Sequence, residues 1–215
     1  MNFSEAVRLS KHAEKVGADA LSAIPPIFFH YRDEDIYNYY KSLAGSTNLP
    51  FVMYNHPSAN GGMSAETVAK IFEIDNITGV KWTVNNYYEM MHLKDITNGE
   101  INIINGPDEM LISGLAAGAD AGIGTTYNVM LPQYLKIYKY FTEGNVEEAR
   151  EIQYKVNRVI KCMAKNEVIS AVKSMCSLLG FPAGEATYPL RNMQGDGISK
   201  LQVELSELGW PFAED

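Results

Sequence analysis

The chain has 215 residues, of which 46% are hydrophobic and 20% are charged, enough for one sizeable buried core and a small additional domain. Its 26 acidic and 18 basic residues give a formal charge of −8 without a long run of either sign, which argues against nucleic acid and anionic membrane as partners. No apolar run approaches the roughly 18 residues that span a bilayer, and no signal pattern opens the sequence. We therefore expect a cytoplasmic globular protein.

Cysteine and histidine usage argues against a metal site. Cys162 and Cys176 are the only cysteines, and two residues in predicted helices give neither a disulfide framework nor metal-ligand spacing. The histidines lack the His-Glu-x-x-His spacing and a paired carboxylate, which favours positions on the surface or behind a site over ligand roles; they are His12, His30, His56 and His92. We expect no metal and no cofactor, and a reducing compartment.

The first part of the chain alternates between helical and strand-like patterns. The predicted strands are 20–24, 51–54, 77–83, 101–104 and 121–124. The predicted helices are 4–16 with Ser4 as cap, 33–44, 64–74 with Ser64 as cap, 85–96 and one that opens at Asp108. The strands are apolar throughout, as expected of a parallel sheet that is covered on its outer face. This α/β pattern predicts a β/α barrel of the TIM type, here a partial barrel with about five parallel strands.

After Pro132 the strand patterns stop. Helices are predicted over 133–141, 146–163, 167–179 and 198–208, the second amphipathic. We therefore expect two domains: a partial β/α barrel over residues 1–141 and a C-terminal helical domain over residues 142–215.

The carboxyl end of the 77–83 strand carries Lys81. In a β/α barrel the chemistry collects at the carboxyl ends of the strands, so an amine at this place faces the expected site. A lysine amine that loses its water is a nucleophile that forms Schiff bases with ketones. The ordinary alternative is a solvated lysine at a strand end, so the case depends on the ends of the neighbouring strands.

Those neighbouring strand ends are polar. Three of the predicted strands are closed by polar segments, and Thr83 lies two residues after Lys81; the segments are Tyr54-Asn55-His56-Pro57, Asn105-Gly106-Pro107-Asp108-Glu109 and Gly122-Ile123-Gly124-Thr125-Thr126-Tyr127-Asn128. Each also has a structural interpretation. Tyr54 is equally well a buried tyrosine bonded to backbone, Asp108 and Glu109 suit a helix N-terminus, and strand-end threonines are usually structural.

Taken in order, these strand ends resemble the N-acetylneuraminate lyases, the sialic acid aldolases of the dihydrodipicolinate synthase superfamily. The resemblance covers nearly the whole chain and includes the helical tail. It implies a class I aldolase that forms a Schiff base without a metal, cleaving N-acetylneuraminate to N-acetylmannosamine and pyruvate. Lys81 would form the imine, and Tyr54 would exchange a proton with the C4 hydroxyl. Thr83, Gly106, Asp108, Glu109 and Thr125 would bind the sugar.

The sequence also departs from the family pattern. Eight strands close a barrel, and only five are predicted, as if the chain began inside the third βα unit. In the family, a glycine-serine-threonine turn holds the pyruvyl carboxylate. This turn belongs to the first three strands of the family barrel, which have no counterpart in this sequence. The segment Ile27-Phe28-Phe29 also lacks the tyrosine that relays protons in relatives, with Tyr31 as a possible substitute.

Alternatives therefore stay open. The chain is expected to be a lyase acting on a keto-sugar acid and pyruvate, either N-acetylneuraminate or another 2-keto-3-deoxy sugar acid. Otherwise it is a noncatalytic relic or a subunit completed by a partner. The family implies a homotetramer, and two aromatic clusters could pack between the domains or across subunits; these are Tyr37, Tyr39 and Tyr40, and Tyr134, Tyr138 and Tyr140.

Overall fold

The computed structural model describes residues 2–59 and 61–212, which form two compact units. Of the described residues, the first unit comprises those up to 107 and 113–123, and the second comprises 108–112 and 124–212. We describe each unit by itself. The division of the sequence at residues 141 and 142 into barrel and helical domain remains a prediction.

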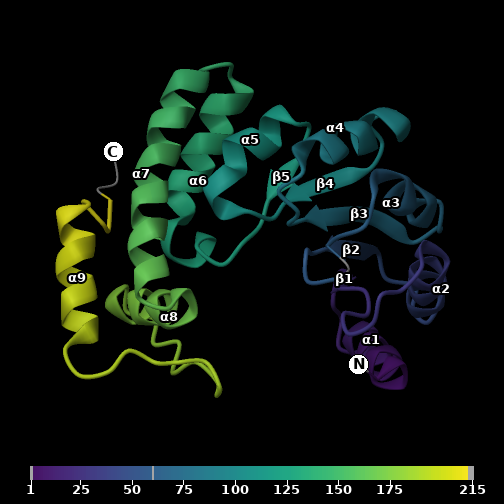
Figure 1. Ribbon diagram of the computed structural model, residues 1–215, viewed down its shortest axis with the longest axis horizontal. Helices are drawn as coiled ribbons and strands as arrows, with labels where there is room; N and C mark the ends of the chain where they lie inside the picture. Colours follow the sequence, from purple (N-terminus) through teal and green to yellow (C-terminus); the bar gives the residue numbers. More distant parts are fainter. Residues whose placement is uncertain (1, 60, 213–215) are drawn as a thin grey trace. The chain divides into compact units, whose positions relative to one another are not determined.

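A parallel sheet forms the centre of the first unit (Figure 1). Its five strands lie in the order β1-β2-β3-β4-β5, and every neighbouring pair is parallel. The bounds are β1 Leu21–Ala23, β2 Phe51–Asn55, β3 Ile77–Trp82, β4 Asn102–Asn105 and β5 Ala121–Gly122. The predicted fold class, parallel strands alternating with helices, is confirmed.

Helices precede and connect these strands. They are α1 Phe3–Lys15, α2 Asp33–Ala44, α3 Ala65–Phe72 and α4 Tyr87–Ile96, followed by the 3-10 helix η1 Asp108–Met110 and by α5 Leu111–Ala116. Ser64 caps α3 as predicted, because its hydroxyl accepts a hydrogen bond from the Thr67 N–H. At α1 the prediction of Ser4 as cap was wrong. The Asn2 side chain caps that helix through the Glu5 N–H, and Ser4 lies inside the first turn.

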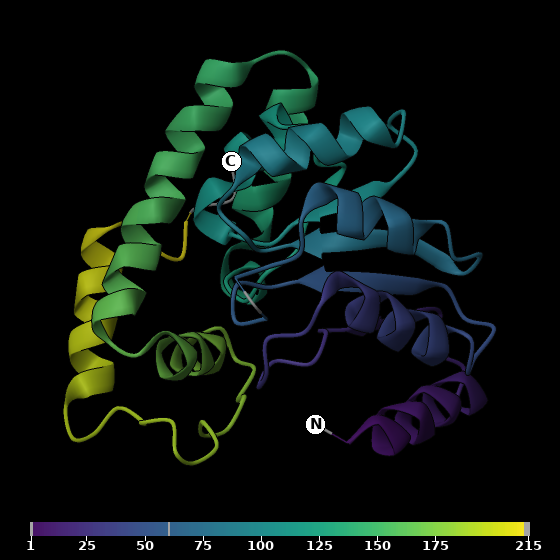
Figure 2. The same cartoon turned by 45° about the vertical axis from the view of Figure 1, so that its right-hand side comes forward.

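One face of the sheet carries the core. Helices α2, α3 and α4 lie along this face (Figures 1 and 2), and their apolar side chains pack on Met53, Val80 and Ile103. Side chains that alternate with these residues, such as Tyr54 and Lys81, are half-buried on the other face. Burial therefore alternates along β2, although the sequence pattern is apolar throughout, and α2, α3 and α4 cover one face of the sheet.

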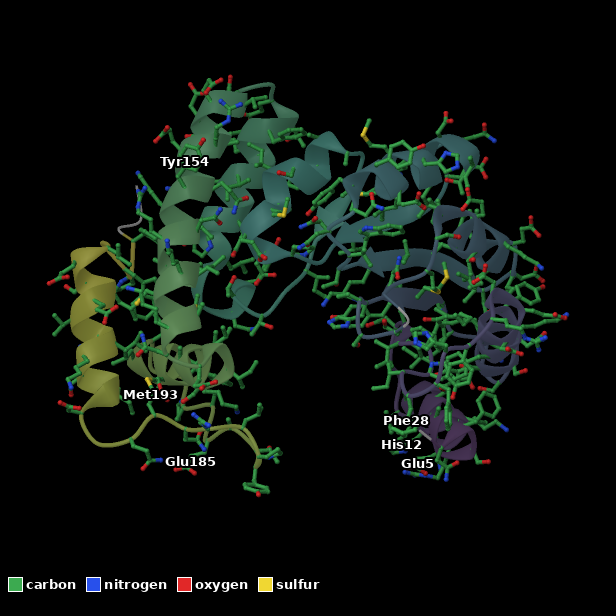
Figure 3. All side chains as sticks on the ribbon, viewed as in Figure 1. Glu5, His12, Phe28, Tyr154, Glu185 and Met193 are labelled. Carbon is green, nitrogen blue, oxygen red and sulfur yellow. The ribbon has the colours of Figure 1, made fainter. Side chains whose placement is uncertain are left out.

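Four helices make up most of the second unit. They are α6 Tyr127–Thr142, α7 Val146–Lys165, α8 Val168–Leu178 and α9 Gly197–Glu207. Figure 3 labels Tyr154 on α7 and Met193 in the segment between α8 and α9. The indole N–H of Trp210 donates a hydrogen bond of 3.0 Å to the Val129 carbonyl, which ties the segment after α9 to α6.

Helix α6 begins six residues before its predicted start at residue 133. A proline inside a helix removes one hydrogen bond. In the structure two helical segments join across a kink at Met130, whose φ of −143° is not helical, and Pro132 follows this break. A proline near the start of the second segment disturbs little.

One tyrosine of each aromatic cluster is buried, whereas Tyr138 is 39% exposed. Tyr40 is fully buried in the first unit, and Tyr134 is 2% exposed in the second, where it stacks on Tyr127 at 3.8 Å between ring centroids. Each therefore packs inside its own unit, and these two side chains give no support to an oligomer. Within residues 2–59 and 61–212, no helix has the length and apolar character to cross a membrane.

Candidate active site

The carboxyl ends of β2 and β3 bring Tyr54 and Lys81 together. The two residues are paired in the parallel register, and the Lys81 Nζ lies 4.3 Å from the centroid of the Tyr54 ring. Both side chains are half-buried. A cation over a tyrosine face is attracted by the ring electrons, typically by about 0.5–2 kcal/mol, so the contact fixes the amine at the edge of the sheet.

The strand ends form one continuous edge in the first unit. A main-chain hydrogen bond continues the ladder just beyond each of three strands; these bonds run from Thr83 to Asn55, from Gly106 to Trp82 and from Ile123 to Asn105, at 2.9, 2.8 and 3.0 Å. Carboxyl ends of parallel strands meet at the same edge. The register therefore places Tyr54, Lys81, Thr83 and Gly106 along one edge, as the sequence predicted.

Helix α2 holds the ends of β1 and β2 through Tyr40. The Tyr40 hydroxyl donates a hydrogen bond of 2.9 Å to the Ala23 carbonyl and accepts one of 3.4 Å from the Tyr54 N–H. Burial raises the pKa of Tyr40 far above its usual value, so the phenol keeps its proton and remains a donor. This contact positions the Tyr54 backbone, and sequence reasoning did not identify it.

Asn55 closes the loop that follows β2. Its side-chain amide donates to the Met63 carbonyl at 3.0 Å and accepts from the Met63 N–H at 2.7 Å. Asn55 is fully buried, so this pair of bonds satisfies an amide that would otherwise be costly to bury. In the Tyr-Asn-x-Pro motif, Tyr54 thus lies at the sheet edge and Asn55 fixes the loop.

Asn105 plays a similar part at the end of β4. It is fully buried, it accepts a hydrogen bond of 3.0 Å from the Tyr87 hydroxyl, and it donates one of 2.7 Å to the Pro107 carbonyl. A side chain at Gly114 would meet the Asn105 amide oxygen at 2.2 Å, so α5 approaches this amide too closely for any residue but glycine. The signal in the sequence that could have identified both residues is an asparagine at the end of an apolar strand, Asn55 in β2 and Asn105 in β4.

Thr83 and Gly106 are in close contact. A Cβ added at Gly106 would lie 2.0 Å from the Thr83 Oγ1, so only glycine allows this approach. The Thr83 hydroxyl is buried and has no hydrogen-bond partner among the described residues. A buried hydroxyl without a partner is unfavourable.

The three remaining predicted residues belong to the second unit. Asp108 is 8% exposed, and its Oδ2 accepts hydrogen bonds from the N–H and the hydroxyl of Thr126 at 2.7 and 2.6 Å. Glu109 and Thr125 are exposed. The Asp108 carboxylate is therefore engaged within its own unit, whereas the side chains of Glu109 and Thr125 are accessible to solvent.

No metal site emerges from the side chains that the structure describes. Among residues 2–59 and 61–212 there is no group of three or more histidine, cysteine, aspartate or glutamate side chains arranged to hold an ion.

Sequence comparison assigns the family. Residues 1–208 match the Dihydrodipicolinate synthetase family, and the chain belongs to this family. It is 32% identical over 207 residues to the N-acetylneuraminate lyase of Rhizobium meliloti, covering 96% of this chain and 69% of that protein. It is also 31% identical over 208 residues to the 4-hydroxy-tetrahydrodipicolinate synthase of Methanococcus aeolicus, covering 95% of this chain and 71% of that protein.

Comparison of structures agrees with this result. A solved structure of a catalytic lysine mutant of the Ruminococcus gnavus sialic acid aldolase superimposes with a TM-score of 0.90 at 29% identity, covering 99% of this chain and 72% of that one. The chain is thus homologous to aldolases and lyases of the family and spans about seven tenths of their length.

Proposed function

We propose that this chain is an N-acetylneuraminate lyase, a class I aldolase in which Lys81 forms the Schiff base. The observation that carries the proposal is the Lys81 amine held 4.3 Å from the Tyr54 ring at the ends of two adjacent parallel strands. The names of the relatives support it, because N-acetylneuraminate lyase and sialic acid aldolase recur among them and one of those aldolases has a catalytic lysine.

The reaction begins with addition of the neutral Lys81 amine to the C2 ketone of the open-chain sugar acid. Loss of water gives an imine, which is protonated and withdraws electrons from C3. When the C4 hydroxyl loses its proton, the C3–C4 bond breaks. Its electron pair moves to the imine as an enamine, and the C4 side leaves as the aldehyde N-acetylmannosamine. Protonation of the enamine at C3 and hydrolysis release pyruvate and restore Lys81.

Tyr54 is the group proposed to exchange the C4 proton. A phenol is a suitable acid and base when a substrate carboxylate or a water assists it. Tyr54 adjoins Lys81 in the register, so its hydroxyl and the amine serve one substrate. The role of Tyr54 is distinct from that of Tyr40, whose hydroxyl is bonded to the Ala23 carbonyl.

The sugar hydroxyls are proposed to bind Thr83, Gly106, Asp108, Glu109 and Thr125. Thr83 has a hydroxyl without a protein partner among the described residues, and Gly106 lets backbone approach the substrate. Exposed Glu109 and Thr125 offer an acceptor and a donor. Asp108 already binds Thr126, so its contribution to the substrate would come through the other carboxylate oxygen or through the position of this loop.

Two further functions compete with this one. Another pyruvate-dependent lyase for a 2-keto-3-deoxy sugar acid would use the same Lys81 and Tyr54, and comparison of turnover on both acids separates the two. The second competing function is that of a noncatalytic subunit or of a subunit completed by a partner. It is considered because the chain spans 69% of its Rhizobium meliloti relative. Assembly into a homotetramer is part of the proposal and is tested by light scattering.

Borohydride trapping tests the proposed function. The purified chain is incubated with pyruvate, reduced and digested, and each lysine is examined by mass spectrometry for the reduced adduct. We expect the adduct on Lys81 and its loss in Lys81→Ala. Lys70→Ala is the matched control, because the Lys70 Nζ also lies over a tyrosine ring, 5.0 Å from the Tyr37 centroid. Absence of an adduct on the folded chain would favour the noncatalytic alternative.

A further inference from the structure

His56 lies against the proposed catalytic pair. It follows β2 directly, two residues after Tyr54, and the two rings meet edge to face with centroids 5.4 Å apart and planes at 89°. The Tyr54 ring also faces the Lys81 amine, at 4.3 Å from its centroid. One tyrosine ring is therefore in contact with both an amine and an imidazole.

The main chain fixes the orientation of the His56 ring. The Ser58 N–H donates a hydrogen bond of 3.1 Å to Nδ1, and the Ser58 hydroxyl lies 2.7 Å from the same atom. A backbone N–H only donates, so Nδ1 acts as the acceptor and the neutral ring carries its proton on Nε2. A ring bonded in this way does not rotate freely, and it presents a fixed surface to Tyr54.

From these contacts we infer that His56 is a positioning residue that holds the Tyr54 ring beneath the Lys81 amine. The inference rests on the proposed function for its catalytic consequence, but the contact itself does not depend on any activity. An edge-to-face pair contributes about 0.5–1.5 kcal/mol beyond area burial, a factor of about 2–10 in the population of one ring orientation. Loss of the contact lets Tyr54 rotate away from Lys81, which misplaces the phenol and uncovers the amine.

The catalytic consequence is measured with the variants His56→Ala and His56→Phe. Phenylalanine keeps an aromatic ring against Tyr54, whereas alanine removes it. We expect His56→Ala to lower kcat on N-acetylneuraminate about 2–10-fold with little change in KM, and His56→Phe to restore most of kcat. A fall in both variants alike, or a change confined to KM, overturns the inference. Urea unfolding of both variants reports any loss of stability.

A second measurement does not require turnover. Reductive methylation with formaldehyde and a mild hydride labels lysine amines, and the rate at Lys81 relative to Lys70 reports how well each ring covers its amine. We expect His56→Ala to raise this ratio about 2–10-fold and His56→Phe to leave it near the native value. If pyruvate leaves no adduct on the native chain, the proposed function fails, and an unchanged ratio separately overturns the role of His56.

Discussion

Thr126 donates two hydrogen bonds to a single carboxylate oxygen of Asp108, from its N–H at 2.7 Å and from its hydroxyl at 2.6 Å. The Thr126 hydroxyl also contacts the hydroxyl of the buried Tyr134. Burial raises the pKa of Tyr134 far above its usual value, so the phenol stays protonated. Three buried polar groups therefore form a hydrogen-bonded chain that joins the first residue of η1 to α6.

Thr126→Val removes the Thr126 hydroxyl, which lies between Asp108 and Tyr134, and keeps the shape of the side chain. The variant leaves the Asp108 carboxylate with one Thr126 donor in place of two, and it deprives Tyr134 of a contact. We expect the free energy of unfolding to fall by about 1–3 kcal/mol, as measured by urea titration. Thr126→Ser keeps the hydroxyl and should stay within about 1 kcal/mol of the native chain. Equal stability of the two variants would show that the hydroxyl contributes nothing.

We propose that position 124 requires a glycine because the Asp108 side chain leaves no space there for a Cβ atom. A Cβ at position 124 would lie 1.5 Å from the Asp108 Oδ1, and its three nearest atoms all belong to this side chain. We expect Gly124→Ala to lower the free energy of unfolding by about 1–3 kcal/mol in the native chain. In a chain that already carries Asp108→Ala, the same change should cost far less, because the colliding atoms are gone. Additive costs in this double-mutant cycle would contradict the steric explanation.

The sequence predicted the pairing of Lys81 with Tyr54 because strand-end residues of a parallel sheet share an edge, and that rule depends only on chain order. It did not predict that Asp108 binds Thr126. That contact joins residues 18 positions apart through a loop, and no periodicity marks it. Tyr40 was missed for a related reason. A tyrosine on an amphipathic helix looks the same in sequence whether its hydroxyl reaches solvent or the end of a strand.

Asn55 offers a third test, at the end of β2 beside the candidate active site. Asn55→Asp retains an acceptor for the Met63 N–H but has no donor for the Met63 carbonyl, and it places a charge in a fully buried position. We expect the free energy of unfolding to fall by about 2–4 kcal/mol at neutral pH, more than for Asn76→Asp, whose amide is only half-buried. Urea titration of both variants makes the comparison. A smaller loss for Asn55→Asp would contradict the closing role of this amide.

The last prediction concerns Cys162, whose thiol lies 3.4 Å from the Glu204 carboxylate in the second unit. Burial, together with the hydrogen bond to this carboxylate, raises the pKa of Cys162 to about 11. At pH 8 only about one thiol in a thousand is then ionised, and the thiolate is the form that reacts. We therefore expect iodoacetamide to modify Cys162 slowly, as followed by mass spectrometry of the digested chain.

Glu204→Gln removes the charge but keeps the shape of the neighbour, so it separates the carboxylate from burial as the cause. The pKa of the Cys162 thiol should fall toward its ordinary value in this variant, and alkylation at pH 8 should quicken several-fold, because each unit of pKa changes the thiolate population about tenfold. The half-buried Cys176 serves as the internal control and should react at the native rate. If Cys162 keeps its native rate in Glu204→Gln while Cys176 is also unchanged, burial alone holds the proton, and Glu204 has no part in suppressing this thiol.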